Sequence, residues 1–142
     1  TIEDKNAIIQ ADPLPQMNVI PFQIQQLFIN LIGNSLKFSK AGRYPVIRIT
    51  CEEVVNKNNN SEVVNTENRY NRISIQDNGI GFDQQYAETI FVLFRRLHMK
   101  NDYPGSGIGL SICKKIVENH GGYITARGIP DIGATFDIFL PI

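Results

Sequence analysis

The sequence has little charge imbalance, few cysteines and no long apolar run. Each of these absences argues against a class of protein or of partner. Its 142 residues carry 14 basic and 14 acidic side chains, a balance that argues against nucleic acid as a partner, because duplexes select a basic face. Its 2 cysteines form no C-x-x-C pair, so we expect two buried, reduced thiols. No stretch approaches the roughly 18 apolar residues of a membrane span, and no charged-then-apolar leader opens the chain. These features predict a cytoplasmic fragment of a longer protein, without direct membrane contact.

Three widespread phosphate-binding motifs are missing as well. The segment GSGIGL does not satisfy G-x-G-x-x-G, because its sixth position is Leu110. The chain has no G-x-x-x-x-G-K-[ST], and the protein-kinase set of a strand lysine, HRD and DFG is also absent. The dinucleotide-binding, P-loop and protein-kinase classes are therefore excluded.

What the sequence does contain is the pattern of one globular domain over residues 1–142. Hydrophobic residues make up 42% and charged residues 20%, which is typical of soluble proteins, and the length allows a sizeable core. Helical periodicity predicts a helix over 21–38, with proline in its first turn. A second helix is predicted over 108–119, because His-Gly-Gly follows it. The apolar positions of the first helix form one buried face: Ile24, Leu27, Phe28 and Leu31.

Alternating apolar residues predict four strands, over 45–55, 69–76, 123–127 and 134–140. The last two form an antiparallel pair across a turn that contains glycine, proline and aspartate: Gly128, Pro130, Asp131 and Gly133. The asparagine-rich stretch of about 56–68 is expected to be a polar hairpin loop. Between Asp83 and Pro104 the pattern is patchy, and we expect a short helix and a mobile loop. Helices and strands mixed in this order favour a two-layer α/β sandwich.

Two glycine runs, DNGIGF at 77–82 and GSGIGL at 105–110, are unusual in an ordinary domain. Each glycine within regular structure costs roughly 0.5–1 kcal/mol relative to alanine, so we expect a role beyond folding. Gly105, Gly107 and Gly109 precede the second helix, whose free N–H groups and positive dipole end suit an anion such as phosphate. The alternative is that these glycines only permit tight packing of a helix against a strand.

Asn30, Asn34 and Lys37 form a narrow polar line beside the buried face of the first helix, within roughly 60° of one another at about 100° per residue. An amide oxygen suits Mg²⁺, which takes few protein ligands and keeps phosphate and water for the rest. Lys37 would neutralise phosphate charge. The alternative is a solvated helix face.

Asp77 ends a predicted strand just before the first glycine run. A carboxylate there would accept a hydrogen bond from an exocyclic amine such as that of adenine, while Gly79 and Gly81 would let a flat ring approach. The alternative is an Asp-Asn-Gly turn, which is common in any fold. These separate signals gain weight only because they occur together.

In their order and spacing, these segments resemble the ATP-binding catalytic domain of sensor histidine kinases, within the superfamily of gyrase, chaperone, mismatch-repair and histidine-kinase ATPases. Five segments carry the resemblance: the N box FINLIGNSLKF (28–38), the G1 box DNGIGF (77–82), the F box IFVLFRRL (90–97), the G2 box GSGIGLSICKKIVENHGG (105–122) and the closing GATFDIFLP (133–141). The sequence around the G2 box is most similar to the phytochrome-like branch. The resemblance implies a Bergerat-type fold, in which helices cover one face of a mixed sheet, and a mobile ATP lid at about 83–106.

The resemblance also implies a role for each matching position. Asn34 would ligate Mg²⁺, Asn30 would help to hold the metal–phosphate group, and Lys37 would meet phosphate. Asp77 would bind the adenine amine. The other residues of the base pocket would be Phe38, Gly79, Gly81 and Thr135, the last through its hydroxyl. The residues that wrap the phosphates would be Gly105, Gly107, Gly109 and Leu110. In the lid, the anchors would be Phe91 and Phe94, and Arg96 would reach the γ-phosphate.

Position 30 discriminates within the superfamily, because the resemblance implies a glutamate base there in the hydrolysing members and the serine kinases. With Asn30 that base is absent, which favours phosphoryl transfer to a histidine, whose ring needs no such activation. Neither His98 nor His120 begins the His-acidic helix pattern of the family's phosphoacceptor. The expected acceptor is therefore a histidine on a separate dimerisation helical hairpin of the parent kinase, with a response regulator acting after it. We expect the isolated domain to bind Mg·ATP as a monomer without labelling itself.

Two other functions stay open. One is a stand-alone serine kinase or slow ATPase of the same superfamily, which would release phosphate without any added protein. The other is a degenerate nucleotide-binding or docking module without chemistry, against which the intact amide, carboxylate and glycine set argues.

Overall fold

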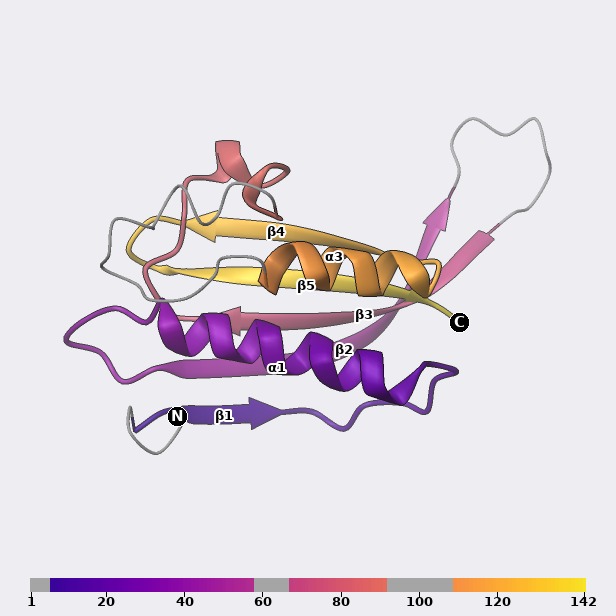
Figure 1. Cartoon of the computed structure of the whole chain (residues 1–142), viewed down its shortest axis with the longest axis horizontal. Coiled ribbons are helices and arrows are strands. Elements are labelled where there is room, and N and C mark those ends of the chain that lie inside the picture. The colour runs from indigo at the N-terminus through magenta and orange to yellow at the C-terminus, as the bar shows by residue number, and fades with distance from the viewer. Residues whose placement is uncertain (1–5, 58–66, 92–108) are drawn as a thin grey trace.

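The fold is built on one mixed sheet of five strands in the order β1-β2-β3-β5-β4 (Figure 1). The computed structural model describes residues 6–57, 67–91 and 109–142. Parallel pairing joins β1 to β2, and the other three pairs are antiparallel. The strands are β1 (Ile8–Ala11), β2 (Val46–Lys57), β3 (Glu67–Asp77), β4 (Tyr123–Ile129) and β5 (Gly133–Pro141).

Two helices, α1 (Pro21–Lys37) and α3 (Gly109–Asn119), lie side by side and antiparallel across one face of the sheet (Figure 1). The short 3-10 helix η1 (Gln84–Tyr86) follows β3 and contacts β4. The two-layer α/β sandwich predicted from the sequence is therefore confirmed, with helices on one face of a mixed sheet.

The hydrophobic core lies between the helices and the sheet. Leu27 and Leu31 of α1 are completely buried, and Ile24 and Phe28 pack half-buried beside them, so the predicted apolar face is confirmed. Full burial of one such leucine contributes about 1.5–3 kcal/mol. The sheet supplies alternate residues of its strands: Ile47, Ile49, Ile73, Ile75, Phe136 and Ile138. Both cysteines are free thiols; Cys113 is buried as expected, but Cys51 is only half-buried.

The helix ends follow the sequence signals and add one contact that the signals did not show. Proline stands at the start of α1, and α3 ends as predicted, with Gly121 at a φ of 75°. The Ile20 N–H donates to Nε2 of His120 at 3.0 Å, and Nδ1 of the same ring lies 2.8 Å from the Ile116 carbonyl oxygen. This pairing requires a neutral imidazole with its proton on Nδ1. His120 therefore joins the start of α1 to the end of α3.

Several boundaries differ from the predictions. The sequence patterns gave no prediction for β1, whose four residues are tied to the fold through parallel pairing with β2. The β2–β3 hairpin is longer than expected, because residues 56–57 and 67–68 continue the ladder; residues 58–66 of the expected loop lie outside the described part. In the β4–β5 hairpin the strands reach Ile129 and Gly133, so Gly128 belongs to a strand rather than to the turn. The short helix expected after Asp83 is confirmed as η1.

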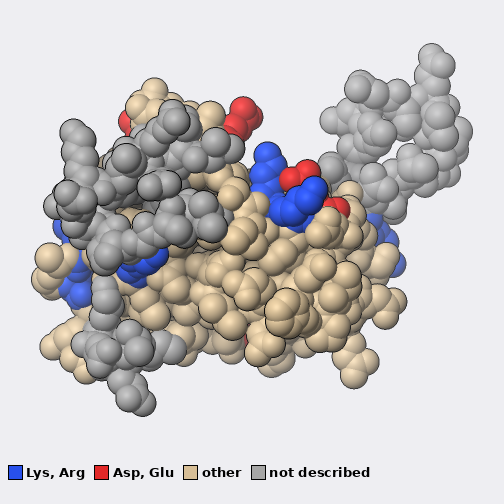
Figure 2. Space-filling view, in the orientation of Figure 1, with Lys and Arg blue, Asp and Glu red and all other residues tan. Residues whose placement is uncertain are grey.

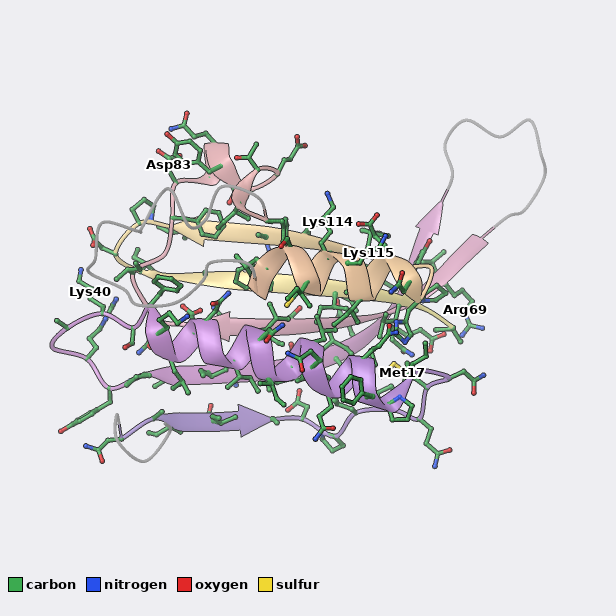
Figure 3. All side chains as sticks on the ribbon, in the orientation of Figure 1. Met17, Lys40, Arg69, Asp83, Lys114 and Lys115 are labelled. Atoms are coloured by element: carbon green, nitrogen blue, oxygen red, sulfur yellow. The ribbon has the colours of Figure 1, made fainter. Side chains whose placement is uncertain are left out.

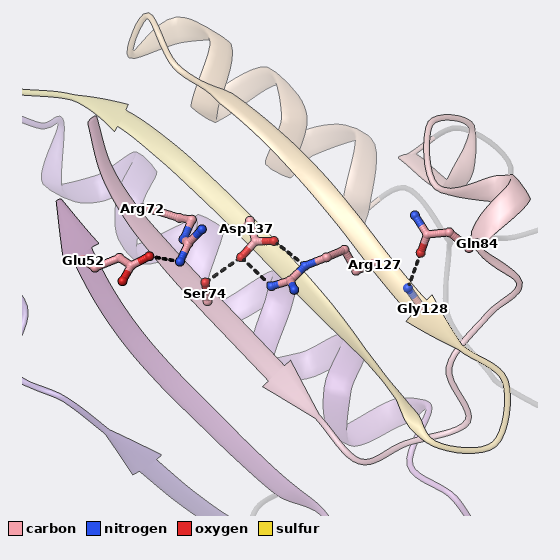
Figure 4. Close-up of polar contacts among 7 residues, drawn as sticks. All are labelled: Glu52, Arg72, Ser74, Gln84, Arg127, Gly128 and Asp137. Atoms are coloured by element: carbon pink, nitrogen blue, oxygen red, sulfur yellow. Dashed lines mark hydrogen bonds and ion pairs between the residues drawn. The ribbon is translucent and has the colours of Figure 1, made fainter. Parts of the chain in front are cut away.

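The sheet face away from the helices carries a hydrogen-bonded polar network (Figure 4). Asp137 on β5 is 4% exposed, and it accepts hydrogen bonds from the Ser74 hydroxyl at 2.5 Å and from Nε of Arg127 at 2.8 Å. Arg72 pairs with Glu52 across the neighbouring strands. A buried carboxylate needs such partners, because an unpaired charge in this position would cost several kcal/mol.

The helix side of the molecule is poor in charge over α1 (Figure 2). Pro21–Leu36 contains no Asp, Glu, Lys or Arg, whereas Lys114 and Lys115 project from α3 (Figure 3). Within the described ranges, neither helix combines the length and the apolar character that a bilayer span requires.

Candidate functional site

A small pocket opens where the last turns of α1 meet the end of β3 and the start of β5. Its volume is about 20 Å³, which is room for about one water molecule. Nine residues line it: Asn34, Ser35, Phe38, Asp77, Ile80, Gly81, Phe82, Ala134 and Phe136. The fold thus brings together four residues that the sequence assigned to one site, namely Asn34, Phe38, Asp77 and Gly81.

Asp77 is held in this pocket by three hydrogen-bond donors from separate parts of the chain. Its Oδ1 accepts from the Gly79 N–H at 2.9 Å and from the Ala134 N–H at 3.2 Å. Its Oδ2 accepts from the Ser35 hydroxyl at 2.9 Å. The carboxylate is therefore fixed in orientation, and Oδ2 retains acceptor capacity, because a carboxylate oxygen has two lone pairs.

Burial raises the pKa of Asp77 above its ordinary value, and the hydrogen bonds from Gly79, Ser35 and Ala134 oppose that shift. Phe82 and Phe136 supply apolar wall nearby. An acceptor with little water around it discriminates strongly between a ligand that donates a hydrogen bond and one that does not. Asp77 thus presents a fixed acceptor atom beside apolar walls.

A second group of polar atoms lies further along α1, where the helix faces the start of α3. A Cβ placed on Gly109 would be 4.0 Å from Cβ and Cγ of Asn30, so the first residue of α3 packs against this amide. Oδ1 of Asn30 accepts from Nε2 of Gln26 at 3.1 Å. Its Nδ2 is buried, with no hydrogen-bond partner among the described residues. A buried donor without a partner costs about 1–3 kcal/mol, so this position suits an added acceptor such as an anionic oxygen.

The polar line of α1 reaches from this second group to the pocket. Asn34 lines the pocket, and Lys37 is the final residue of the helix, half-buried. Since residues 21–37 are continuously helical, Asn30, Asn34 and Lys37 share the side of α1 that the spacing predicted.

The glycines of the first run are explained by backbone packing. A Cβ on Gly79 would lie 2.5 Å from the Phe38 carbonyl oxygen, and one on Gly81 would lie 2.1 Å from the Ile129 carbonyl oxygen. Gly81 also has a φ of 64°. Close backbone packing therefore accounts for both glycines, and Gly81 also lines the pocket; their expected role in admitting a flat ring stays a prediction.

Thr135 does not lie where the sequence analysis expected it. Side chains alternate along β5, so Ala134 and Phe136 face the pocket and Thr135 faces the other side of the sheet. There its neighbours across the ladder are Gln76 and Arg127. The prediction that the Thr135 hydroxyl supports the base pocket is therefore wrong. The contact from β5 to Asp77 is made by the backbone N–H of Ala134 instead.

Leu110 also differs from the expectation. Its side chain is 1% exposed and belongs to the core, so only its main chain in the first turn of α3 can face an anion. Phe91 is buried and packs edge-to-face on Phe136, with ring centroids 6.1 Å apart; its role as an anchor of the lid stays a prediction. The other predicted lid and phosphate residues lie outside the described part of the chain: Phe94, Arg96, Gly105 and Gly107.

The sequence reasoning missed Ser35, which is 3% exposed and binds Asp77. A signal was present, because Ser35 stands four and eight residues after Leu31 and Leu27 on the buried face of the helix. A hydroxyl in such a position needs a partner. Ile80, Phe82, Ala134 and Phe136 were missed because their meeting depends on how the strands pair.

Comparison with known proteins agrees with this geometry. The family described as histidine kinase-, DNA gyrase B-, and HSP90-like ATPase matches residues 20–142. The phytochrome-like protein Cph1 of Synechocystis is 38% identical over 99% of this chain, and the adaptive-response sensory kinase SasA of Microcystis aeruginosa is 32% identical over 100% of it. The mycobacterial sensor histidine kinase MprB has the same fold, with a TM-score of 0.76 and 21% identity over 99% of this chain and 87% of that one.

The chain therefore belongs to the histidine kinase-, gyrase B- and HSP90-like ATPases, and within them it is the catalytic ATPase domain of a histidine kinase. The family predicted from the sequence motifs is thereby confirmed, including the likeness to phytochrome-like relatives. The chain spans 17% of the length of Cph1 and 34% of that of SasA.

Proposed function

We propose that this domain binds Mg·ATP and transfers the γ-phosphoryl group to a histidine on a separate dimerisation hairpin of the parent sensor kinase. The observation that supports this most is the meeting of Asp77 and Asn34 in one pocket, next to the Asn30–Gly109 contact. The two groups adjoin along α1, so a base at Asp77 and a phosphate chain at Asn30 would follow the order that one nucleotide requires.

The adenine ring is proposed to enter the pocket at Asp77. Its exocyclic amine would donate to Oδ2, which the Ser35 hydroxyl leaves free to accept a second hydrogen bond. Phe38, Phe82 and Phe136 would pack against the ring. Because a purine needs more room than the pocket has, neighbouring side chains would shift as it enters.

The phosphates and Mg²⁺ are proposed to lie along α1 and the start of α3. The residues fit this group, because Nδ2 of Asn30 has no hydrogen-bond acceptor in the part of the chain that the structure describes and the N-terminal end of a helix favours anions. When bound, Mg²⁺ would neutralise phosphate charge and orient the γ-phosphoryl group. Asn34 would offer its amide oxygen to the metal, Lys37 its positive charge to the phosphates, and Gly109 a bare main chain.

The acceptor is proposed to be histidine because this domain offers no base at position 30. An imidazole nitrogen has a free lone pair at neutral pH; it would bond to the γ-phosphorus while the bond to the bridging oxygen breaks and ADP leaves. Water and serine hydroxyls react slowly without a base to remove their proton, and Asn30 has no proton-accepting group at neutral pH. A response regulator would then receive the phosphoryl group from the hairpin.

Three measurements on the purified domain test the proposal. A fluorescent ATP analogue should bind more tightly with Mg²⁺ than without it, phosphate release by the domain alone should be slow, and the added hairpin of the parent kinase should become labelled on histidine. Brisk phosphate release without added protein would instead indicate the stand-alone ATPase or serine kinase. Absence of nucleotide binding would indicate the docking module.

A further inference from the structure

Gln26 contacts the phosphate end of the proposed site from inside α1. It stands one turn before Asn30, and its Nε2 donates to Oδ1 of Asn30 at 3.1 Å. The neighbouring Gln25 is exposed, whereas Gln26 is half-buried. The two adjacent glutamines thus have different surroundings, although their chemistry is the same.

This hydrogen bond determines which end of the Asn30 amide remains available. An amide has an acceptor oxygen and a donor nitrogen on opposite branches of one carbon. Because the oxygen is engaged by Gln26, the nitrogen is the free end, and it is buried without a partner among the described residues. Burial raises the pKa of the nearby Cys113 thiol and a contact with the Asn30 side chain lowers it, but a thiol sulfur is only a weak acceptor.

We propose that Gln26 is a positioning residue, which holds Asn30 with its N–H group toward the phosphates. Asn30 then acts as a hydrogen-bond donor to a phosphate oxygen, and Asn34 alone offers an amide oxygen to the metal. This inference rests on the proposed nucleotide site. It divides the work of two chemically identical side chains: one binds the anion and the other the cation.

The proposal distinguishes two substitutions of nearly equal size. Gln26→Leu removes the donor and lets the Asn30 amide rotate, which should weaken Mg·ATP binding about three- to tenfold, as expected for one misaligned hydrogen bond. Gln26→Glu replaces the donor by a carboxylate acceptor, which attracts the Asn30 N–H and turns the Asn30 oxygen toward the phosphates. Gln26→Glu should therefore weaken binding more than Gln26→Leu, by over tenfold. Gln25→Leu is the matched control and should bind like wild type.

The test measures the affinity of these variants for a fluorescent ATP analogue with Mg²⁺, and for adenosine, which has no phosphate. Adenosine affinity should not change, and the thermal midpoints should stay near that of Gln25→Leu. In an Asn30→Ala background, Gln26→Leu should have no further effect, because Gln26 is proposed to act only through Asn30. NMR of the nucleotide-free protein should show shifted Asn30 side-chain amide signals in Gln26→Leu and unchanged signals in Gln25→Leu.

Equal affinities of Gln26→Leu, Gln26→Glu and Gln25→Leu would overturn the positioning role, as would an undiminished effect of Gln26→Leu in the Asn30→Ala background. Both of these outcomes leave the proposed function intact, because wild type still binds Mg·ATP. Wild type that does not bind nucleotide would overturn both proposals. Unchanged Asn30 amide signals in Gln26→Leu would by themselves exclude Gln26 as the residue that orients Asn30.

Discussion

Replacement of Asp77 by asparagine should separate binding from stability. The three contacts that hold the carboxylate can be kept in the variant, with the contact to Ser35 reversed in direction. The amide oxygen can accept from the N–H groups of Gly79 and Ala134, and the new NH₂ group can donate to the Ser35 hydroxyl, which has free acceptor lone pairs. The fold should therefore tolerate Asp77→Asn.

The sign of the stability change follows from the pKa. Burial raises the pKa of Asp77 in the folded protein, so the ionised form is less favourable there than in the unfolded chain. The unfavourable contribution is fully present above the folded pKa and disappears as the pH falls through it. At neutral pH, Asp77→Asn removes this contribution, and the midpoint of thermal unfolding should stay the same or rise.

Nucleotide binding should change in the opposite direction. In place of Oδ2, the variant presents an N–H group to the adenine amine, so two donors face each other. Loss of one hydrogen bond to a charged acceptor costs about 1.5–3 kcal/mol, which corresponds to a loss of about ten- to a hundredfold in affinity. Inosine triphosphate carries an oxygen in place of the amine, so the preference for ATP over inosine triphosphate should shrink or reverse.

The assay is titration of wild type, Asp77→Asn and the control Asp131→Asn with both nucleotides, together with thermal unfolding. Asp131 is a suitable control, because its side chain is exposed and forms an ion pair with Lys40 at the surface. If Asp77→Asn bound ATP like wild type, the carboxylate would not recognise the base. If its unfolding midpoint fell sharply, the residue would be mainly structural.

The other predictions concern the metal, the packing and the helix ends. Asn34→Ala should remove the Mg²⁺-dependent part of ATP-analogue binding and spare the rest; binding that keeps its Mg²⁺ dependence would contradict the metal assignment. Gly81→Ala should destabilise the domain by about 3 kcal/mol or more, since its Cβ would lie 2.1 Å from the Ile129 carbonyl oxygen. Gly42→Ala, which shares a positive φ but has nothing within 4 Å of the added atom, should cost only about 1 kcal/mol in urea unfolding; equal losses would show that backbone strain alone matters. His120→Ala should cost about 1–2 kcal/mol because it removes the links to Ile20 and Ile116, and unchanged urea stability would refute that role.

Local patterns predicted the elements that local chemistry controls. The face of α1 at Leu27 and Leu31 and the end of α3 at Gly121 depend on residues within a few positions of one another. The polar line of α1 likewise needs only helical geometry. The family motifs added the order of the segments, from which we predicted that Asn34 and Asp77 belong to one site.

The features that the sequence did not predict depend on contacts between distant segments of the chain. Thr135 was assigned to the pocket, but a shift of one residue along a strand reverses its face, and the register of β5 against β3 decides between Ala134 and Thr135. The reason for Gly81 depends on Ile129, which is 48 positions later along the sequence. The parallel pairing of β1 is equally remote from any local signal.

The link through His120 holds α1 and α3 together at one end of the pair. The ring fastens α1 and α3 at the end remote from Gly109, so a small tilt of α3 pivots there and displaces its first turn furthest. The contact between Asn30 and Gly109 lies at the other end of the helix pair, away from this link. If phosphates bind there as proposed, they meet the helix pair at the end that His120 does not hold, whereas the base meets a pocket whose carboxylate is held by three hydrogen bonds.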